Sequence, residues 1–277
     1  MTQGFDLTSY DFYSNRYEED LVTSIVDSLK KIISQDQKEK QPLFLNIKDG
    51  FLENIARRVV QKKDKSILIG ITGESASGKS TFVDWTVRAC VKDKIDGIYT
   101  VIRCDDYYKD TSKELRDAGS YEALFRTGFS FDVPEALNLD LMKQHLIKLK
   151  KGESVVSPRY DFVTCESFPD GEVKKPARIL LTEGLYVLHE TMRDIVDVKV
   201  YVSTPIEVLK TRWYKRAATR GKTGEAADSQ YKDVNKTAQL YIRPTEAISD
   251  VVINGLVEVG YIQNITDRIF SVIENAY

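Results

Sequence analysis

The sequence has few histidines and few cysteines, and this scarcity limits its chemistry. Two histidines, His145 and His189, leave little material for histidine-centred catalysis or a His-rich metal site. The three cysteines are odd in number and lack CxxC spacing, which argues against a disulfide framework and against a structural zinc site. We therefore expect a reducing, cytoplasmic compartment, with carboxylates, lysines and backbone amides carrying any chemistry.

Long apolar runs and an excess of charge of one sign are also missing. No run approaches the roughly 20 residues that a helix needs to cross a bilayer, and residues 1–6 lack the basic and apolar regions of a signal peptide. The 40 Lys+Arg nearly balance the 42 Asp+Glu, so no global positive field attracts nucleic acid or an anionic membrane. We expect neither partner, and any anion site must be local.

The remaining composition has the balance of a soluble globular protein. Hydrophobic residues make up 42% of the 277 residues and charged residues 30%, which excludes a disordered or fibrous chain. Near the start, apolar side chains recur at helical spacing over residues 21–33 and again over 51–60, with a polar connector at 34–41. We predict a helical N-terminal extension, residues 1–64, that packs on a second domain, residues 65–277.

From Ser66 onward, short apolar runs alternate with helical segments. This alternation is typical of parallel strands with crossover helices. We predict an α/β fold with a mostly parallel five-stranded sheet flanked by helices. The expected strands cover residues 67–72, 98–104, 177–182, 196–202 and 251–254.

A complete phosphate-binding motif follows the first of these strands. Residues 73–81 read GESASGKST and match GxxxxGK[ST], with an apolar helical segment behind them. This context argues against an incidental Gly/Ser turn and indicates a P-loop NTPase fold, in which backbone N–H groups and the helix dipole face the phosphates. Lys79 would bridge the β- and γ-phosphates, and the Ser80 hydroxyl would lie on Mg²⁺. The predicted ATP-binding residues of this loop are Gly73, Glu74, Ser75, Ala76, Ser77, Gly78, Lys79, Ser80 and Thr81.

Acidic residues follow two further strands. Ligands of open parallel sheets bind outside the carboxyl ends of the strands, where Asp105 and Asp106 follow the second predicted strand and Glu183 follows the third. A carboxylate there can accept a proton from an attacking hydroxyl or help to hold Mg²⁺. The alternatives are a turn or helix cap for the aspartates, and a salt bridge under a glycine turn for Glu183.

Residues 209–222 carry six basic side chains and no acidic one. Such a segment suits a lid whose arginines fold over a triphosphate, and glycines at 221 and 224 suit a mobile tip. We predict a helical lid over about residues 209–235; the alternative is a basic, solvated helix face. The six cations are Lys210, Arg212, Lys215, Arg216, Arg220 and Lys222.

Four segments together resemble the uridine kinase family, within the wider group that includes phosphoribulokinase and pantothenate kinase. They are the P-loop, residues 105–110 (DDYYKD), residues 157–164 (SPRYDFVT), and the run from Arg212 through Arg220-Gly-Lys to Ser229-Gln-Tyr231. The resemblance covers roughly residues 66–256. It implies a kinase that uses ATP and Mg²⁺ and phosphorylates a primary hydroxyl of a small-molecule acceptor, in uridine kinases the 5′-hydroxyl of uridine or cytidine.

Two other functions stay open at this point. One is a kinase of the same group that acts on another alcohol, such as a sugar phosphate or pantothenate. The other is a nucleotide-binding regulator without turnover, although Asp105 argues against it because a binder needs no base opposite the γ-phosphate. Family members are often oligomers, so the resemblance also allows a homo-oligomer.

The resemblance also assigns roles to single residues. Asp105 matches the general base, and Asp105, Glu183 and Ser80 match the groups near Mg²⁺, with Lys79 as the catalytic cation. The ATP-binding lid arginines are Arg216 and Arg220. The residues that match the acceptor site, through sugar, base or lid contacts, are Asp132, Tyr108, Tyr160, Arg212 and Gln230. For the two tyrosines, ordinary packing is the alternative.

The sequence departs from the family pattern where the base would be read. Uridine kinases usually have a histidine and then an arginine after the Tyr-Asp-Phe segment, whereas this chain has Cys165 and Ser167. A thiol is a weak hydrogen-bond partner. Lys222 also replaces the usual arginine of the lid, and a lysine cannot hold two oxygens as a planar fork. We therefore expect phosphoryl transfer with reduced pyrimidine selectivity.

Overall fold

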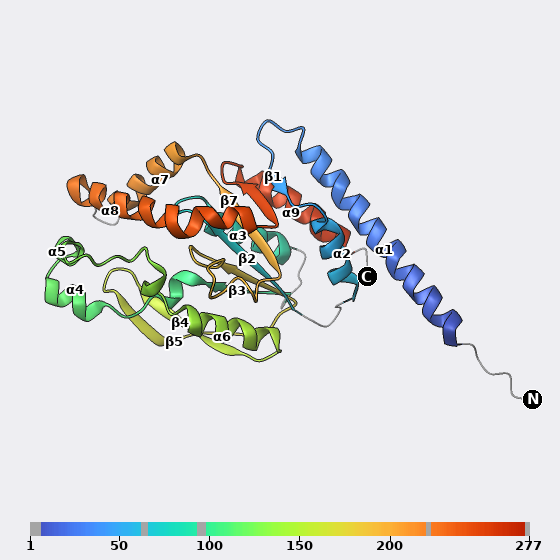
Figure 1. The fold of residues 1–277 in the computed structure, drawn as a ribbon, viewed down its shortest axis with the longest axis horizontal. Coiled ribbons are helices and arrows are strands. Elements are labelled where there is room, and N and C mark those ends of the chain that lie inside the picture. The colour runs from blue at the N-terminus through green and yellow to red at the C-terminus, as the bar shows by residue number, and fades with distance from the viewer. Residues whose placement is uncertain (1–6, 62–65, 93–97, 220–222, 275–277) are drawn as a thin grey trace, which may run out of the picture.

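The computed structural model describes residues 7–61, 66–92, 98–219 and 223–274 (Figure 1). Its centre is a six-stranded sheet in the order β1-β8-β7-β2-β6-β3. The strands are β1 (Phe44–Ile47), β2 (Ile67–Gly73), β3 (Tyr99–Arg103), β6 (Ile179–Glu183), β7 (Val198–Ser203) and β8 (Val251–Asn254). The predicted α/β fold with a mostly parallel sheet is therefore confirmed.

All five predicted strands form, and they run parallel to one another from β8 to β3. Their apolar runs mark them because a parallel sheet is covered on both faces. The sequence predicted five strands, one fewer than the sheet contains, because β1 also pairs with β8, antiparallel, at the edge. β1 has only four residues, and its two central ones are exposed, so it is too short to stand out as a strand in the sequence.

Helices cover both faces of the sheet (Figure 1). On one face, α6 (Leu139–Lys150) packs against Leu68, Ile102 and Leu180 through Met142 and Leu146. The other face, which carries Ile71 and Val200, contacts α3 (Lys79–Lys92) and α9 (Val259–Glu274). Alternate residues of each strand therefore enter two separate cores, as the two-residue period of a strand requires.

The N-terminal helices α1 (Leu7–Asp36) and α2 (Phe51–Gln61) form a third cluster, with Val22, Ile25 and Leu29 facing Ala56 and Val59. The predicted connector is partly helical, because α1 continues to Asp36. The buried carboxylate of Asp36 accepts hydrogen bonds from the N–H groups of Leu43 and Phe44 and so fixes the start of β1. The boundary near residue 64 stays a prediction, and residues 62–65 lie outside the described chain.

A separate two-stranded hairpin, β4 (Val155–Asp161) with β5 (Glu166–Lys174), lies beside α4 (Ser112–Ala118) and α5 (Tyr121–Arg126) (Figure 1). Sequence patterns gave no sign of this hairpin because β5 is largely polar and contains Pro169 and Gly171. The predicted lid forms two helices, α7 (Ile206–Thr219) and α8 (Gly224–Thr237), at the same end of the molecule. Among the described residues, no helix is both long and apolar enough to cross a membrane.

Candidate active site

The P-loop connects β2 to α3, and α3 begins at Lys79, as the motif requires. Gly73 has φ +151°, and a Cβ there would lie 2.6 Å from the carbonyl oxygen of Val202 on the neighbouring strand. The loop is closed internally by Ser77 N–H donating to the Glu74 carbonyl at 3.1 Å. Thr204 donates from Oγ1 to the Ser77 carbonyl at 2.9 Å and ties the loop to β7.

Lys79 is only 8% exposed, and its Nζ donates to the carbonyl oxygen of Glu74 at 2.9 Å. Burial lowers the pKa of Lys79, and the negative charges of Glu183 and Asp105 oppose that shift. The structure thus brings Lys79, Asp105 and Glu183 within electrostatic reach of one another.

Both predicted carboxylates come from neighbouring strands. Asp105 lies in the 3₁₀ helix η1 (Cys104–Tyr107) that directly follows β3, and its side chain is exposed. Glu183 is the last residue of β6, lies opposite Arg103 of β3, and is 6% exposed. The next residue, Gly184, has φ +155°. A Cβ at this position would collide with Cys104, which explains why the residue is glycine.

Arg103 is a site residue that sequence reasoning missed. Its Nη1 lies 3.0 Å from Glu183 Oε1, and its Nη2 lies 2.7 Å from Asp84 Oδ1 on α3. Burial raises the pKa of Glu183, whereas Lys79, a hydrogen bond from Ser80 and the charge of Arg103 lower it. A lone cation at the end of an apolar strand, two positions before Asp105, was the available sequence signal.

The other member of the acidic pair has a different environment. Burial raises the pKa of Asp106 to about 6, with Lys174 opposing the shift and Asp105 adding to it. The side chain is half-buried, whereas that of Asp105 is exposed. The two adjacent aspartates therefore differ in burial.

The oxygen groups near Lys79 fit a magnesium ion. Ser80 supplies a hydroxyl, and Glu183 and Asp105 supply carboxylates, which are hard donors of the kind Mg²⁺ prefers. The described residues contain no group of three or more His, Cys, Asp or Glu side chains that could enclose a metal by themselves. That arrangement agrees with the habit of Mg²⁺ to take one or two protein ligands and complete its shell with phosphate and water.

A cavity of about 560 Å³ lies beside the P-loop, within the size range of small-molecule sites. It is bounded by the P-loop, by Arg212 and Arg216 of α7, and by the segment after β8. Arg216 donates to Ser75 Oγ, and Arg212 Nη1 donates to the Gly255 carbonyl at 3.0 Å. The structure thus puts Arg212 on the P-loop side, where the resemblance had implied a sugar contact. Arg220, Gly221 and Lys222 lie outside the described residues.

Two further contacts connect α7, α8 and the segment after them to the P-loop. An apolar cluster joins α7 to α8, and Ala76 of the P-loop packs against it. The cluster consists of Trp213, Ala217, Ala227 and Val234. Arg243, just after α8, was also missed by sequence reasoning. Its Nε and Nη2 lie 3.0 Å from the two carboxylate oxygens of Glu74, and Nη2 also donates to Asn235 Oδ1 at 2.6 Å.

The predicted base-contacting tyrosines lie together. The rings of Tyr108 and Tyr160 are 5.1 Å apart between centroids and tilted by 36°, with Phe131 and Phe162 at their edges. Burial raises the pKa of Tyr108, and the charge of Asp132 adds to that shift, so Asp132 lies close to the same cluster. Three of the five predicted acceptor residues therefore share one aromatic region.

Cys165 and Ser167 lie at the β4–β5 hairpin, whereas Gln230 lies on α8. Cys165 lies buried at the end of the β4–β5 turn with φ +58°, and its Sγ is 3.2 Å from the hydroxyl of Tyr121. The N–H of Ser167 donates to Asp110 Oδ2 at 3.1 Å. Gln230 belongs to α8, and its amide oxygen is buried.

Known proteins resemble this chain in sequence over its kinase region. Residues 68–260 match the Phosphoribulokinase / Uridine kinase family. A uridine kinase of Shewanella amazonensis is 32% identical over 190 residues, covering 68% of this chain and 86% of that protein. One from Clostridium perfringens is 33% identical over 193 residues, covering 68% and 87%.

Among solved structures, a putative fructose transport system kinase from Silicibacter sp. TM1040 aligns with a TM-score of 0.56 and 20% identity. It covers 72% of this chain and 95% of that one, and it supports the fold alone. The family match and the identity to the bacterial uridine kinases go further. This chain belongs to the phosphoribulokinase/uridine kinase family.

Proposed function

We propose that the protein is an ATP- and Mg²⁺-dependent kinase of the uridine kinase type. It transfers the γ-phosphoryl of ATP to a primary hydroxyl, the 5′-hydroxyl of uridine, cytidine or a related ribose-bearing metabolite. One observation carries the proposal: Lys79 of the P-loop lies within electrostatic reach of two carboxylates, Asp105 and Glu183, that come from adjacent strand ends.

Nucleotide binding is assigned to the P-loop and the lid. The P-loop amides and Lys79 bind the β- and γ-phosphates, and Arg216, which already contacts Ser75, adds positive charge from α7. We assign Arg212 to the nucleotide as well, because its guanidinium borders the P-loop cavity. Arg220 stays a predicted ATP contact.

Proton transfer is assigned to Asp105. Its exposed carboxylate accepts the proton of the attacking hydroxyl while that oxygen bonds to the γ-phosphorus and the bond to the leaving ADP oxygen breaks. Ser80 and Glu183 would hold Mg²⁺, which supplies charge neutralisation on the phosphate oxygens when bound. Arg103 orients the Glu183 carboxylate through its ion pair, and its charge, like that of Lys79, favours the ionised form.

Acceptor recognition is assigned to the aromatic region. Asp132 holds the ribose hydroxyls, and the faces of Tyr108 and Tyr160 contact the base. Gln230 of the lid stays a predicted sugar contact. The buried free thiols Cys104 and Cys165 support a reducing, cytoplasmic setting, and a homo-oligomer stays a prediction.

An ATP-consumption assay over a panel of acceptors tests the proposal. The panel contains uridine, cytidine, adenosine, guanosine, pantothenate and a sugar phosphate, and mass spectrometry identifies the phosphorylated product. We expect turnover with a ribonucleoside, dependence on added Mg²⁺, and no activity in Lys79→Ala. The control Lys143→Ala removes only a surface pair with Asp194 and should behave as wild type. ATP binding without turnover on any acceptor would refute the proposal, as would full activity of Lys79→Ala.

A further inference from the structure

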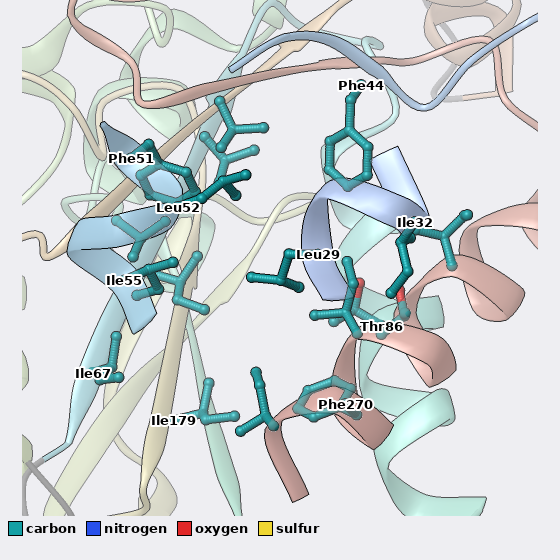
Figure 2. Close-up of a pocket in the computed structure, with 18 of the residues that line it drawn as sticks. Leu29, Ile32, Phe44, Phe51, Leu52, Ile55, Ile67, Thr86, Ile179 and Phe270 are labelled. Carbon is teal, nitrogen blue, oxygen red and sulfur yellow. The ribbon is translucent and has the colours of Figure 1, made fainter. Parts of the chain in front are cut away.

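An apolar cavity of about 310 Å³ lies between the sheet and the N-terminal helices, on the face opposite α6 (Figure 2). Figure 2 shows Leu29 of α1 between the side chains of α2, among them Leu52 and Ile55, and those around Ile32 and Phe44. Residues of β2, β6 and α9 lie on a further side, where Ile67, Ile179 and Phe270 border the same space.

The sheet below this space is incompletely covered. Ile67 and Ile69 belong to β2, a strand hydrogen-bonded on both sides, yet both remain only half-buried. Ile179 of the adjacent β6 is half-buried too. Central parallel strands are normally covered on both faces and protein interiors are close-packed, so space at this position requires an explanation.

The described part of the cavity wall is poorly suited to holding water. The described residues that line the cavity are apolar except for three, Thr86, Thr266 and Arg178. A buried water needs two to four polar partners, and cavities with aliphatic walls stay dry or take apolar molecules. Arg178 is an exposed residue and the one cationic side chain among the described residues that line the cavity.

We propose that this cavity binds one unbranched acyl chain with a carboxylate head, such as a medium-chain fatty acid. A cavity of about 150 Å³ accommodates one benzene molecule, so this volume suits a chain on the order of a dozen carbon atoms. A flexible chain can follow walls made mainly of isoleucine, leucine and valine. The carboxylate head is assigned to Arg178 because it is the one cation among the described lining residues.

The site is separate from the nucleotide cavity but adjoins it. Phe82, in the first turn of α3, lines both cavities, and so does Ile253 of β8. The helices that cover the cavity, α1 and α2, precede residue 68, where the family match begins. The proposed site therefore depends on the N-terminal segment that lies outside that match.

Calorimetry on the full chain without nucleotide tests the proposal independently of any kinase assay. The probes are dodecanoate, kept below its micelle concentration, hexanoate and dodecan-1-ol. We expect dodecanoate to bind one to one, at least about tenfold more tightly than hexanoate because fewer methylene groups are buried by the shorter chain. It should also bind more tightly than dodecan-1-ol, which lacks the charged head.

Cavity-filling variants provide the structural control. Leu29→Trp and Ile55→Phe each fill the space and should weaken dodecanoate binding by about tenfold or more. The matched variant Leu45→Trp alters β1 at a 48% exposed side chain that does not line the cavity, and it should bind normally. Thermal unfolding confirms that each variant is folded. If Leu29→Trp is not folded, dodecanoate binding by Ile55→Phe tests the site.

Arg178→Gln tests the head group, because it should weaken binding of dodecanoate while leaving dodecan-1-ol unchanged. Absence of one-to-one dodecanoate binding would overturn the proposal, and so would normal binding by a folded filling variant. Equal affinity for dodecanoate and dodecan-1-ol would overturn the acyl-carboxylate assignment in favour of an uncharged apolar ligand. A protein that binds dodecanoate but shows no kinase activity would refute the proposed function and leave this site standing.

Discussion

Arg243 and Glu74, 169 residues apart in the chain, form a two-point ion pair that fastens the segment after α8 to the P-loop. The same guanidinium reaches Asn235 of α8, so one side chain connects the lid helix to the loop. Planar, bidentate pairs of this kind fix orientation as well as distance. Arg243 therefore acts as a positioning residue, through Glu74, on the loop predicted to bind phosphate.

The first prediction concerns this pair. Arg243→Gln should weaken ATP affinity by roughly five- to tenfold, about 1 kcal/mol or somewhat more, because Glu74 loses both of its charge-assisted hydrogen bonds. Arg243→Lys should recover only part of the loss, since an ammonium cannot form the fork. Titration with a non-hydrolysable ATP analogue measures both.

The control is Arg126→Gln, which removes an exposed pair with Glu122 and should leave ATP affinity unchanged. In the double variant Glu74→Gln/Arg243→Gln, the losses should be clearly less than additive, because both substitutions remove the same interaction. Additive losses would mean that the two residues act independently on ATP.

The second prediction separates the adjacent aspartates. Asp105→Asn should keep ATP affinity within a few fold but reduce kcat by a factor on the order of 10² or more, because a lost general base is felt in the transition state. Asp106→Asn should stay close to wild type in kcat. Steady-state kinetics at saturating ATP measure the difference. The reverse pattern would show that Asp106 is the base.

The third prediction is a pH dependence of stability that comes from Asp106. The folded-state pKa of about 6 lies above the usual carboxyl value, so between about pH 4 and 6 the folded state holds more protons than the unfolded state. The free energy of unfolding contributed by this group therefore falls as pH rises through that window and stays low above it. Allowing for solvent screening of a half-buried group, the loss is at most about 2 kcal/mol.

Asp106→Asn removes this titration, so the variant should gain stability over wild type at pH 7.5 and much less at pH 4.5, where Asp106 is largely protonated when folded. Urea unfolding at both pH values measures the effect. If the difference in free energy of unfolding between Asp106→Asn and wild type were equal at the two pH values, the result would contradict the assignment.

The fourth prediction concerns Cys165. With a thiol where the family usually has a histidine, discrimination between nucleosides should fall well below the roughly 10⁴-fold that a dedicated hydrogen-bonding site reaches. Cys165→His should raise kcat/KM for uridine selectively, by about one hydrogen bond, about 1 kcal/mol or somewhat more. A left-handed backbone is tolerated by histidine better than by most residues, which makes the change feasible at φ +58°.

Cys165→Ser is the matched control, because it keeps the size and the contact with Tyr121 but adds no ring nitrogen. It should leave nucleoside preference unchanged. A wild-type enzyme that phosphorylates uridine efficiently and excludes purine nucleosides would show that another residue reads the base.

Sequence patterns predicted those parts of the molecule that local residue order encodes. The P-loop, the five parallel strands and the carboxylates at their ends are each marked by a continuous run of residues, and the fold agrees with all five strands. The contacts that those residues make are not encoded in local residue order. Arg103 meets Glu183 only because β3 lies beside β6, and Arg243 meets Glu74 only because the segment after α8 lies against the P-loop.

The elements that escaped prediction share one cause. β1 is only four residues long and pairs with the distant β8, and the β4–β5 hairpin depends on the largely polar β5, so in each case the strand depends on a partner that local sequence does not reveal. Arg212 illustrates the same limit for the site. Its family position was readable from sequence, but its place beside the P-loop depends on how α7 lies against the segment after β8.

The position of Phe82 has a thermodynamic consequence. Because this ring lines both cavities, a rotamer or backbone shift that suits one occupant alters the surroundings of the other. Binding equilibria that share such a group are reciprocal: whatever factor an apolar occupant imposes on nucleotide affinity, the nucleotide imposes on the affinity of that occupant. Measuring the apolar ligand with and without nucleotide therefore gives the same coupling free energy as the opposite titration, and Phe82→Leu is the substitution that should change it.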